Sequence, residues 1–295
     1  MNSKQASQKI DLTSLKAGGF IKQCQPDMFA VRLRVPVGDV TSEQLKAVAS
    51  IAEKYGTSRV HLTARQGIEI NDIKLDDFDE VKEKLKKAGL SLGACGARVR
   101  VVTGCPGKDV CPKGVGSTKK LGLALDDAFF GQGDLPHKFK MAVTGCPNSC
   151  VKPQENDLGF VAVVKPALDE SENECIACNL CEKACQTGAL KMVNERPVID
   201  EAICDNDGLC IKACPVDCLI EEKQGWNVSV GGRFGRNPKL GQIYKTFVDT
   251  KDIKKLSEAI IQAYRNLGEN RERTGAMIDR IGLEALKKEV NSILG

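Results

Sequence analysis

Alternating and helically spaced apolar positions predict the first elements of the chain. Residues 29–35 (FAVRLRV) alternate between apolar and polar side chains and include β-branched residues, which predicts a strand. Apolar residues then recur at helical spacing over residues 45–52. Thr41 and Gln44 are spaced as a capping box before this segment, and Gly56 is placed to end it. We therefore expect a helix between them.

The next segments follow an order that is typical of one fold. Residues 59–62 and 68–70 are strand-like and flank a short turn, and residues 76–89 form a Lys- and Glu-rich helical segment. Strand, helix, hairpin and helix in succession are the order of a ferredoxin-like α+β unit. We predict a ferredoxin-like half-domain over residues 20–90, preceded by a polar N-terminal arm over residues 1–19.

The remainder of the chain alternates glycine-rich loops with short elements. Residues 117–130 predict a helix and residues 139–144 predict a strand, while cysteines occupy the loops around them. Strand-like alternation returns at residues 226–230, and two amphipathic helices are expected to close the chain. The fold class is therefore α+β, with a second α+β domain over residues 91–167 and 223–295 that is interrupted by a cysteine-rich insertion over residues 168–222.

Composition narrows the class of protein. Hydrophobic residues make up 42% of the 295 residues, and no apolar run approaches the ~18 residues of a membrane helix, so we expect no membrane partner. The polar start lacks the apolar segment of a secretory signal, which favours a cytoplasmic protein. A net charge of +4, interpreted as dispersed, predicts no nucleic-acid partner. The 14 cysteines therefore favour metal ligation or catalysis over disulfides.

Half of these cysteines belong to an internal repeat in the insertion. An offset of 29 residues relates Cys175, Cys178, Cys181 and Cys185 to Cys204, Asp207, Cys210 and Cys214. The spacing C-x2-C-x2-C-x3-C holds 4Fe-4S clusters because closely spaced thiolates on a tight loop reach one cluster. A zinc module is the alternative, but it needs only four ligands per site and does not explain the repeat.

The insertion resembles a two-cluster bacterial ferredoxin, and the resemblance implies which side chains act together. In that pattern the fourth cysteine of each run serves the other cluster. One cluster is thus assigned to Cys175, Cys178, Cys181 and Cys214, and the other to Cys185, Cys204, Cys210 and Asp207. Cys218 lies outside the repeat and is interpreted as a spare thiol, with ligation of the second cluster in place of Asp207 as the alternative.

Four further cysteines, outside the insertion, form another candidate metal site. Cys105 and Cys111 are separated by five residues, Cys146 and Cys150 by three, and both pairs begin within Thr-Gly-Cys-Pro. Here the chain resembles the sirohaem sulfite and nitrite reductases, in which this pair of spacings holds a 4Fe-4S cluster. The resemblance implies that the Cys150 thiolate bridges the cluster to sirohaem iron. A set of buried structural cysteines is the alternative.

Cationic residues recur near these thiols, as a buried polycarboxylate cofactor and an anionic substrate require. The resemblance assigns four of them to the substrate oxyanion: Arg32, Arg100, Lys138 and Lys140. It assigns the cofactor a further set of residues: Arg34, Arg65, Gln66, Arg98, Thr103, Thr144, Asn148, Gly231, Gly232, Arg233 and Arg236. The alternative for each charged residue is a solvated surface position. Four residues match no site: the histidines His61 and His137, interpreted as bystanders, and the unassigned Cys24 and Cys95.

A single unit with an inserted ferredoxin resembles the small anaerobic and dissimilatory-type sulfite reductases. The resemblance implies a six-electron reduction of sulfite to sulfide at sirohaem, with nitrite reduction to ammonia as the alternative. No dinucleotide-binding motif is present, so an external donor protein is expected to supply electrons. A lone unit is expected to self-associate, because larger relatives pair two units in one chain. An electron-transfer subunit and a sirohaem protein without activity are the remaining alternatives.

Overall fold

The computed structural model describes residues 11–169 and 175–295. Residues 1–10 of the predicted N-terminal arm lie outside this description. The rest of the arm contains the helix α1 (Leu12–Ala17), whose first N–H groups are accepted by the Asp11 carboxylate. The sequence predicts neither α1 nor the strand β1 (Phe20–Lys22), because both are too short to show a hydrophobic period.

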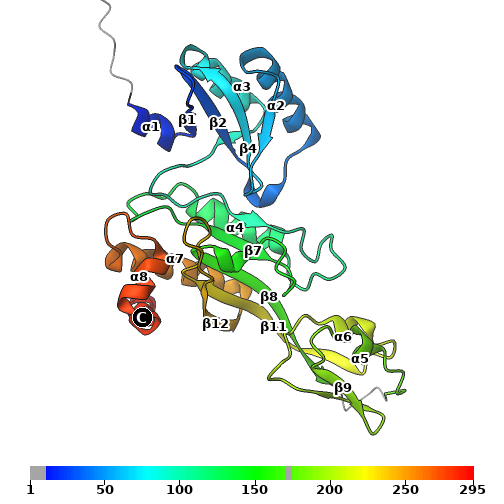
Figure 1. The fold of residues 1–295 in the computed structure, drawn as a ribbon. Helices are drawn as coiled ribbons and strands as arrows, with labels where there is room; N and C mark the ends of the chain where they lie inside the picture. Colours follow the sequence, from blue (N-terminus) through cyan, green and yellow to red (C-terminus); the bar gives the residue numbers. More distant parts are fainter. Residues whose placement is uncertain (1–10, 170–174) are drawn as a thin grey trace, which may run out of the picture.

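The half-domain is an antiparallel sheet covered by two helices (Figure 1). Strand β2 lies at its centre and pairs with β1, β4 and β5, while β4 also pairs with β3. The order of the elements confirms the predicted strand, helix, hairpin and helix. They are β2 (Met28–Arg34), η1 (Pro36–Gly38), α2 (Ser42–Tyr55), β3 (Val60–Leu62), β4 (Ile68–Lys74), η2 (Leu75–Asp77), α3 (Phe78–Lys87) and β5 (Ser91–Leu92).

Local sequence explains why these elements begin and pack where they do. Both hydrogen bonds of the predicted capping box are present, with Thr41 and Gln44 each accepting the other's backbone N–H at 3.1 and 2.9 Å. The apolar positions of α2 and α3 face the sheet, where they form a core with the β2 and β4 side chains. Phe20 stacks on Phe78 within that core, at 3.9 Å between ring centroids.

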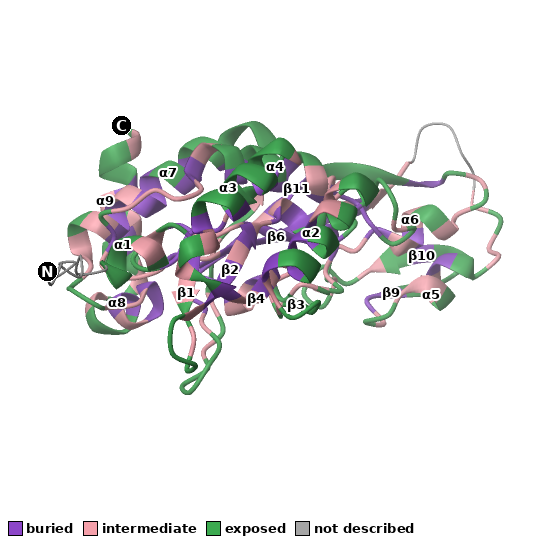
Figure 2. Cartoon of the chain, turned by 90° about the horizontal axis from the view of Figure 1, so that it is seen from above, coloured by how far each residue is buried: buried purple, intermediate pink, exposed green. Residues whose placement is uncertain are grey.

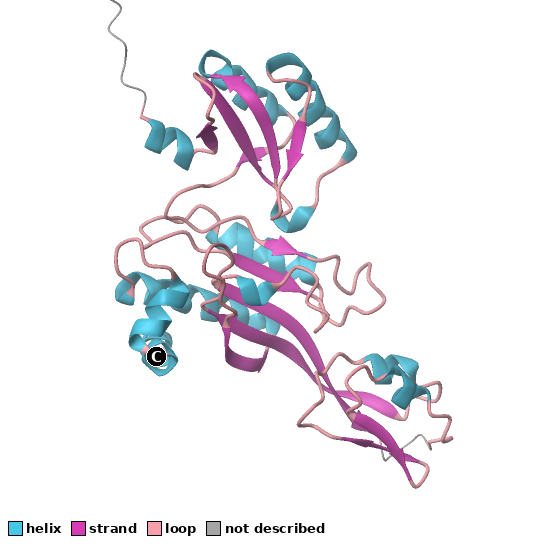
Figure 3. Ribbon diagram, viewed as in Figure 1, coloured by secondary structure: helices cyan, strands magenta, loops and turns pink. Residues whose placement is uncertain are grey.

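A second, mixed sheet forms the larger domain (Figure 3). Its strand order is β12-β11-β8-β7-β6, in which β6, β7 and β8 are parallel and the other pairs are antiparallel. The strands are β6 (Thr103–Gly104), β7 (Met141–Thr144), β8 (Leu158–Leu168), β11 (Leu219–Val230) and β12 (Gln242–Val248). The sequence analysis misses β8, whose almost continuous apolar run is typical of a buried central strand, and the edge strand β12.

Helices cover this sheet and share its hydrophobic core. They are α4 (Thr118–Phe129), η3 (Pro153–Glu155), α7 (Thr250–Leu267), α8 (Thr274–Ile281) and α9 (Leu283–Leu294). The C-terminal segment therefore contains three helices where two are expected, because the chain turns at Gly282 (φ 85°) between α8 and α9. Figure 2 shows buried residues concentrated in the strands and on the inner helix faces. None of the described helices is long and apolar enough to cross a membrane.

The insertion is carried at the tip of a β-hairpin. Strands β8 and β11 pair along their lengths, and Leu168 is opposite Leu219. The chain between them, hereafter the cysteine-rich lobe (residues 168–222), extends away from the domain in Figure 1. Its described elements are α5 (Leu180–Ala184), β9 (Leu190–Val193), β10 (Arg196–Ile199) and α6 (Leu209–Ala213), around a small core of its own. Lys212 ties the lobe back to the domain by donating to the carbonyls of Pro112 and Gly114, both at 2.8 Å.

A buried ion pair joins the half-domain to α4. The Asp126 carboxylate, fully buried, accepts hydrogen bonds from Arg34 at 2.7 Å and from the Val102 backbone N–H at 2.8 Å. We predict that Asp126→Ala lowers the free energy of unfolding by about 3 kcal/mol, because it removes the buried partner of the Arg34 guanidinium and leaves the Val102 N–H group without an acceptor. Denaturant unfolding measures this loss. Asp127→Ala is the matched control: Asp127 also pairs with Arg34 but is exposed, so a loss similar to that of Asp126→Ala would contradict the account.

Candidate functional site

A cavity lined by cations lies between the half-domain and the larger domain. Its volume is about 330 Å³. The lining brings together all four residues that the resemblance assigns to an oxyanion, namely Arg32, Arg100, Lys138 and Lys140, and adds Arg65. Arg32 comes from β2, Arg100 from the loop before β6, and the two lysines from the segment before β7. Lys138 and Lys140 both face the cavity, as their spacing predicts, while Phe139 between them is buried in the core.

Burial and mutual repulsion act together on these cations. Burial, together with the nearby charges of Arg65, Arg273 and Lys138, lowers the pKa of Lys140 to about 8. The pKa of Arg65 falls to about 10, also chiefly through burial. Burial also lowers the pKa values of Lys138 and Arg100. The cavity therefore holds more positive charge than its own acidic groups neutralise, which suits an anionic ligand.

An unpaired donor supports the same conclusion. Among the described residues, the Nε–H group of Arg100 is buried without a hydrogen-bond partner. Buried donors in native proteins are normally satisfied, so this one fits a ligand acceptor in the cavity. The cavity residues are therefore suited to bind an anion, because they offer positively charged hydrogen-bond donors.

Charge is also unevenly distributed along the chain. The cysteine-rich lobe contains 13 acidic and four basic residues, a formal charge of −9, which leaves +13 for all other residues. The interpretation of the net charge as dispersed is therefore wrong. The excess of positive charge lies in the part of the chain that forms the cavity, where it favours an anion.

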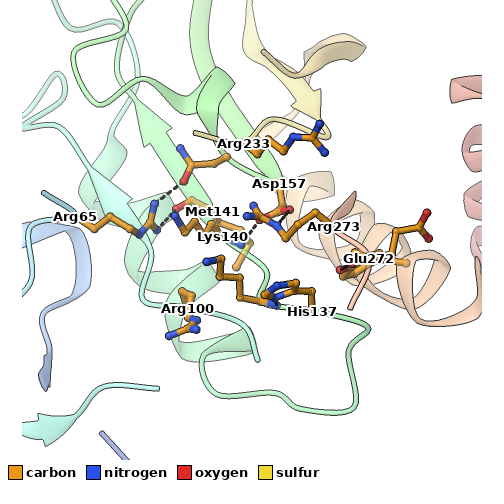
Figure 4. A network of polar contacts seen from close by, with 12 residues as sticks. Arg65, Arg100, His137, Lys140, Met141, Asp157, Arg233, Glu272 and Arg273 are labelled. Carbon is orange, nitrogen blue, oxygen red and sulfur yellow. Dashed lines mark hydrogen bonds and ion pairs between the residues drawn. The ribbon is translucent and has the colours of Figure 1, made fainter. Parts of the chain in front are cut away.

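Two residues that the sequence analysis does not single out support the lysines. Arg273, just before α8, makes a two-point pair with Asp157, with nitrogen–oxygen distances of 3.1 and 2.7 Å. Asp157 is fully buried and also accepts the backbone N–H of Lys140 at 2.9 Å (Figure 4). Neither residue belongs to a recognisable motif, so no sequence signal marks them. His137, interpreted as a bystander, accepts the Lys138 backbone N–H at 2.7 Å, and burial and these cations lower its pKa.

The Arg65-Gln66 turn connects the cavity to the loop that carries Cys105. Arg65 donates to Asn156 Oδ1 at 2.5 Å and to the carbonyls of Val101 and Met141. The Gln66 amide makes two hydrogen bonds with the backbone of Gly104, at 2.8 and 2.9 Å. The Gln66 side chain therefore positions the loop, and its contact with a cofactor carboxylate stays a prediction.

The four core thiols converge on the loops that follow β6 and β7. Burial raises the pKa of Cys146, and the neighbouring thiols of Cys105, Cys150 and Cys111 raise it further. Cys105 Sγ accepts hydrogen bonds from the Gly145 N–H at 3.2 Å and the Thr144 hydroxyl at 3.6 Å. Cys105 and Cys146 are buried, whereas Cys150 is exposed. N–H and O–H donors directed at a sulfur are typical of thiolate ligands of iron–sulfur clusters.

The lobe thiols separate into two groups. Burial raises the pKa of Cys181, with Cys175 and Cys214 adding to the shift, so these three lie together. The second group, Cys185, Cys204, Asp207 and Cys210, lines one small cavity, and burial raises the pKa of Cys210 to about 12. The grouping matches the expected exchange of the fourth cysteine between repeats. For Cys178 the structure shows only that it is half-buried.

Cys218 belongs to the first of these groups. Its Sγ lies 3.3 Å from that of Cys214, and the Cys214 and Cys175 thiols raise its pKa after burial. The alternative in which Cys218 replaces Asp207 as a ligand of the second cluster is therefore wrong, because Cys218 lies beside the thiols of the first group. Asp207 Oδ1 accepts the Leu209 N–H at 2.9 Å.

A groove joins the second lobe group to the core thiols. Its volume is about 270 Å³, and its lining includes Cys146 and Asn148 from the core and Asp205 and Asp207 from the lobe. Asn148 also donates to Cys150 Sγ at 3.8 Å. The second group is therefore the part of the lobe that borders the core thiols.

Several expected cofactor residues lie elsewhere. Arg34 is held by Asp126 and Asp127 and stacks over Phe130, and it does not line the cavity. Six others do not line the cavity either. Arg98 and Arg236 are exposed, and Arg98 donates to the Gly131 carbonyl as Arg233 does to the Asn237 carbonyl. Gly231, Gly232 and Thr103 are buried against neighbouring backbone. Their cofactor contacts stay predictions. Cys24 and His61 are exposed, and neither lines the cavity.

The cavity and the core thiols lie at opposite ends of β7. Lys138 and Lys140 precede the strand, whereas Cys146 and Cys150 follow it. The four residue-to-residue steps of extended chain from Lys140 to Thr144 span roughly 13 Å.

Comparison with known proteins identifies the family of this chain. Residues 95–295 match the nitrite and sulphite reductase 4Fe-4S domain, and residues 21–88 match the nitrite/sulfite reductase ferredoxin-like half domain. The chain belongs to the nitrite and sulfite reductase family. This result confirms the family resemblance and the α+β fold, with its half-domain and 4Fe-4S domain. The family domain implies a 4Fe-4S cluster and sirohaem.

Individual relatives include sulfite reductases. The coenzyme F420-dependent sulfite reductase of Methanocaldococcus jannaschii is 31% identical over 94% of this chain, which spans 44% of that protein. One of the subunits of the anaerobic sulfite reductase of Salmonella typhimurium is 29% identical over 79% of this chain and 73% of its own length. The crystal structure of dissimilatory sulfite reductase I has the same fold, with a TM-score of 0.74 at 20% identity, covering 90% of this chain and 69% of that one.

The Asp157–Arg273 pair predicts how the charge of Lys140 responds to mutation. Asp157 raises the pKa of Lys140 and Arg273 lowers it. Competitive acetylation of the Lys140 amine against pH should therefore give an inflection near 8 in the wild type. Asp157→Asn should move the inflection to lower pH and Arg273→Gln should move it to higher pH. Shifts of the same sign, or none, would contradict the arrangement.

Proposed function

We propose that this protein reduces sulfite to sulfide at a sirohaem coupled to the 4Fe-4S cluster of the Cys105, Cys111, Cys146 and Cys150 site. The observation that carries the proposal is the convergence of four cations on one cavity, in a family whose domain implies both groups. An electron-transfer subunit has no use for such a cavity. The sulfite reductases among the relatives favour sulfite, and nitrite reduction to ammonia is the second candidate.

The residues have separate tasks in this proposal. The core thiols would hold the cluster, the exposed thiol of Cys150 would couple it to sirohaem, and Arg65 would contribute positive charge toward a haem carboxylate. When bound, sirohaem would supply the electron chemistry at the sulfur atom. Arg32, Arg100, Lys138 and Lys140 would bind and orient the oxyanion. Lys140, with a pKa of about 8, is protonated at neutral pH and can release that proton to a departing oxygen at small cost.

The lobe is proposed to be a two-cluster ferredoxin that accepts electrons from an external donor protein. Its two side-chain groups support the proposal, since each collects residues from both repeats. The groove beside Cys146 supports a route from the second group to the core.

Steady-state reduction with reduced methyl viologen tests the function. Sulfite should be turned over with a higher kcat/KM than nitrite. Neutralising Lys138 or Lys140 to Gln should lower turnover about 10- to 150-fold while sirohaem content stays intact, because a charge-assisted contact to a buried anion is worth roughly 1.5–3 kcal/mol. Lys86→Gln, on the exposed face of α3, is the control. Wild-type rates in both cavity variants would refute the assignment, and a preference for nitrite would select the second candidate.

We also propose that the protein is a homodimer or a larger homo-oligomer. The position of the cavity and the core thiols at opposite ends of β7 supports it, because a second copy can bring the cavity of one protomer toward the thiols of another. Analytical ultracentrifugation of the haem-containing protein at low micromolar concentration should therefore give a dimer or larger species. A fully active monomer with intact haem would exclude this pairing.

The carboxylate of Asp207 predicts a labile cluster in the second lobe group. Carboxylate is a harder and weaker ligand than thiolate for cluster iron, so mild oxidation should convert this cluster to a 3Fe-4S form. Asp207→Cys should suppress the 3Fe signal in electron paramagnetic resonance. Cys218→Ala should leave that signal unchanged, since Cys218 lies in the other group. Loss of iron from the second cluster in Cys218→Ala alone would reverse the assignment.

A further inference from the structure

One short segment lines the cavity and contacts two of its cations at once. The segment Gly93–Gly96 (GACG) follows β5, and Ala94 forms part of the cavity wall. The guanidinium of Arg100 donates to the carbonyls of Ala94 and Gly96, at 2.6 and 3.0 Å. The backbone of this segment therefore fixes the direction of one cation of the proposed anion site.

The segment also contains a thiol to which no motif assigns a role. Cys95 is 2% exposed, and its Sγ accepts a hydrogen bond from Arg32 Nη1 at 3.2 Å. The same thiol acts to raise the pKa of Arg100, so it lies near the second guanidinium, whose Nη atoms donate to the carbonyls on either side of Cys95. Cys95 thus lies between two guanidinium groups from segments far apart in the sequence.

The arginines need such a partner because they repel each other. The charge of Arg32 lowers the pKa of Arg100, so the two groups are close enough to interact. A sulfur acceptor beside both groups offsets part of this repulsion. Glu69 binds the other nitrogens of Arg32, at 2.6 and 2.5 Å, so that Arg32 is held on two sides.

Gly93 leaves room for this contact. A Cβ atom at Gly93 would lie 3.1 Å from Cγ of Arg32 and 3.2 Å from the Leu33 carbonyl oxygen. The absence of a side chain therefore lets the stem of Arg32 pass along the segment toward Cys95.

We propose that Cys95 is a positioning residue, which holds Arg32 and Arg100 side by side at the cavity so that both face one oxyanion. The inference rests on the proposed function only in taking the cavity as the anion site. Cys95 itself touches neither substrate nor cofactor; it acts through the two arginines. Serine, which also offers an acceptor of similar size, should preserve most of the arrangement.

Anion binding to the haem-containing protein tests the role. The dissociation constants of sulfite and of nitrite are measured from the shift of the haem absorption, together with haem content, the thermal unfolding midpoint and KM and kcat. Cys95→Ala should raise the dissociation constant and KM for the preferred anion roughly 10-fold, since each guanidinium loses a charge-assisted partner. Haem content and unfolding midpoint should stay at wild-type values, and Cys95→Ser should recover most of the affinity. Cys24→Ala, which removes an exposed thiol of the half-domain, should change nothing.

The outcomes separate the two proposals. Wild-type affinity in Cys95→Ala would overturn the positioning role and leave the proposed function intact. Equal loss of affinity in the Ala and Ser variants, or loss of haem together with affinity, would also overturn it, because the thiol would then support the cofactor or the fold. A wild-type protein that binds neither anion would overturn the proposed function and this inference together.

Discussion

The site depends on holding like charges together in a partly buried space. Arg65, Arg100, Lys138 and Lys140 all have pKa values lowered by burial, so keeping them charged costs free energy. The fully buried Asp157 offsets part of that cost, and its pairing with Arg273 and with the Lys140 backbone fixes its place. The cations remain in excess after these contacts. An anion in the cavity supplies the missing negative charge, so the same repulsion that destabilises the empty site contributes to ligand affinity.

The fold distributes the chemistry along one sheet. The parallel strands β6 and β7 begin at the cations and end at the loops of the core thiols, so a short stretch of rigid backbone fixes both. The antiparallel pair β8 and β11 extends the same sheet outward and carries the lobe. A module inserted at the tip of a hairpin leaves the core packing of the domain intact, and the lobe has a small hydrophobic core of its own. The lobe can therefore be acidic although the rest of the chain has a net positive charge.

Local signals made part of this arrangement predictable from the sequence. The thiol groups were predictable because each motif folds as a tight loop, and the capping box of α2 was predictable because its partners are three residues apart. Contacts between distant segments left no such signal. The Arg34–Asp126 pair was not predicted because its members lie 92 residues apart, and Arg273 was missed because a single arginine in a polar segment looks like any surface charge. Cys95 matched no spacing because its role depends on Arg32, 63 residues earlier.

The central claim is that the cation cavity binds the substrate anion of a sirohaem held by this chain. The most direct measurement is the absorption spectrum of the anaerobically purified protein during titration with sulfite. The account predicts a Soret and a red band that iron–sulfur clusters lack, a shift of both bands on binding, and a much weaker response in Lys140→Gln at equal haem content. A spectrum with only the broad absorption of iron–sulfur clusters, or a sulfite response that is identical in the wild type and in Lys140→Gln, would contradict it.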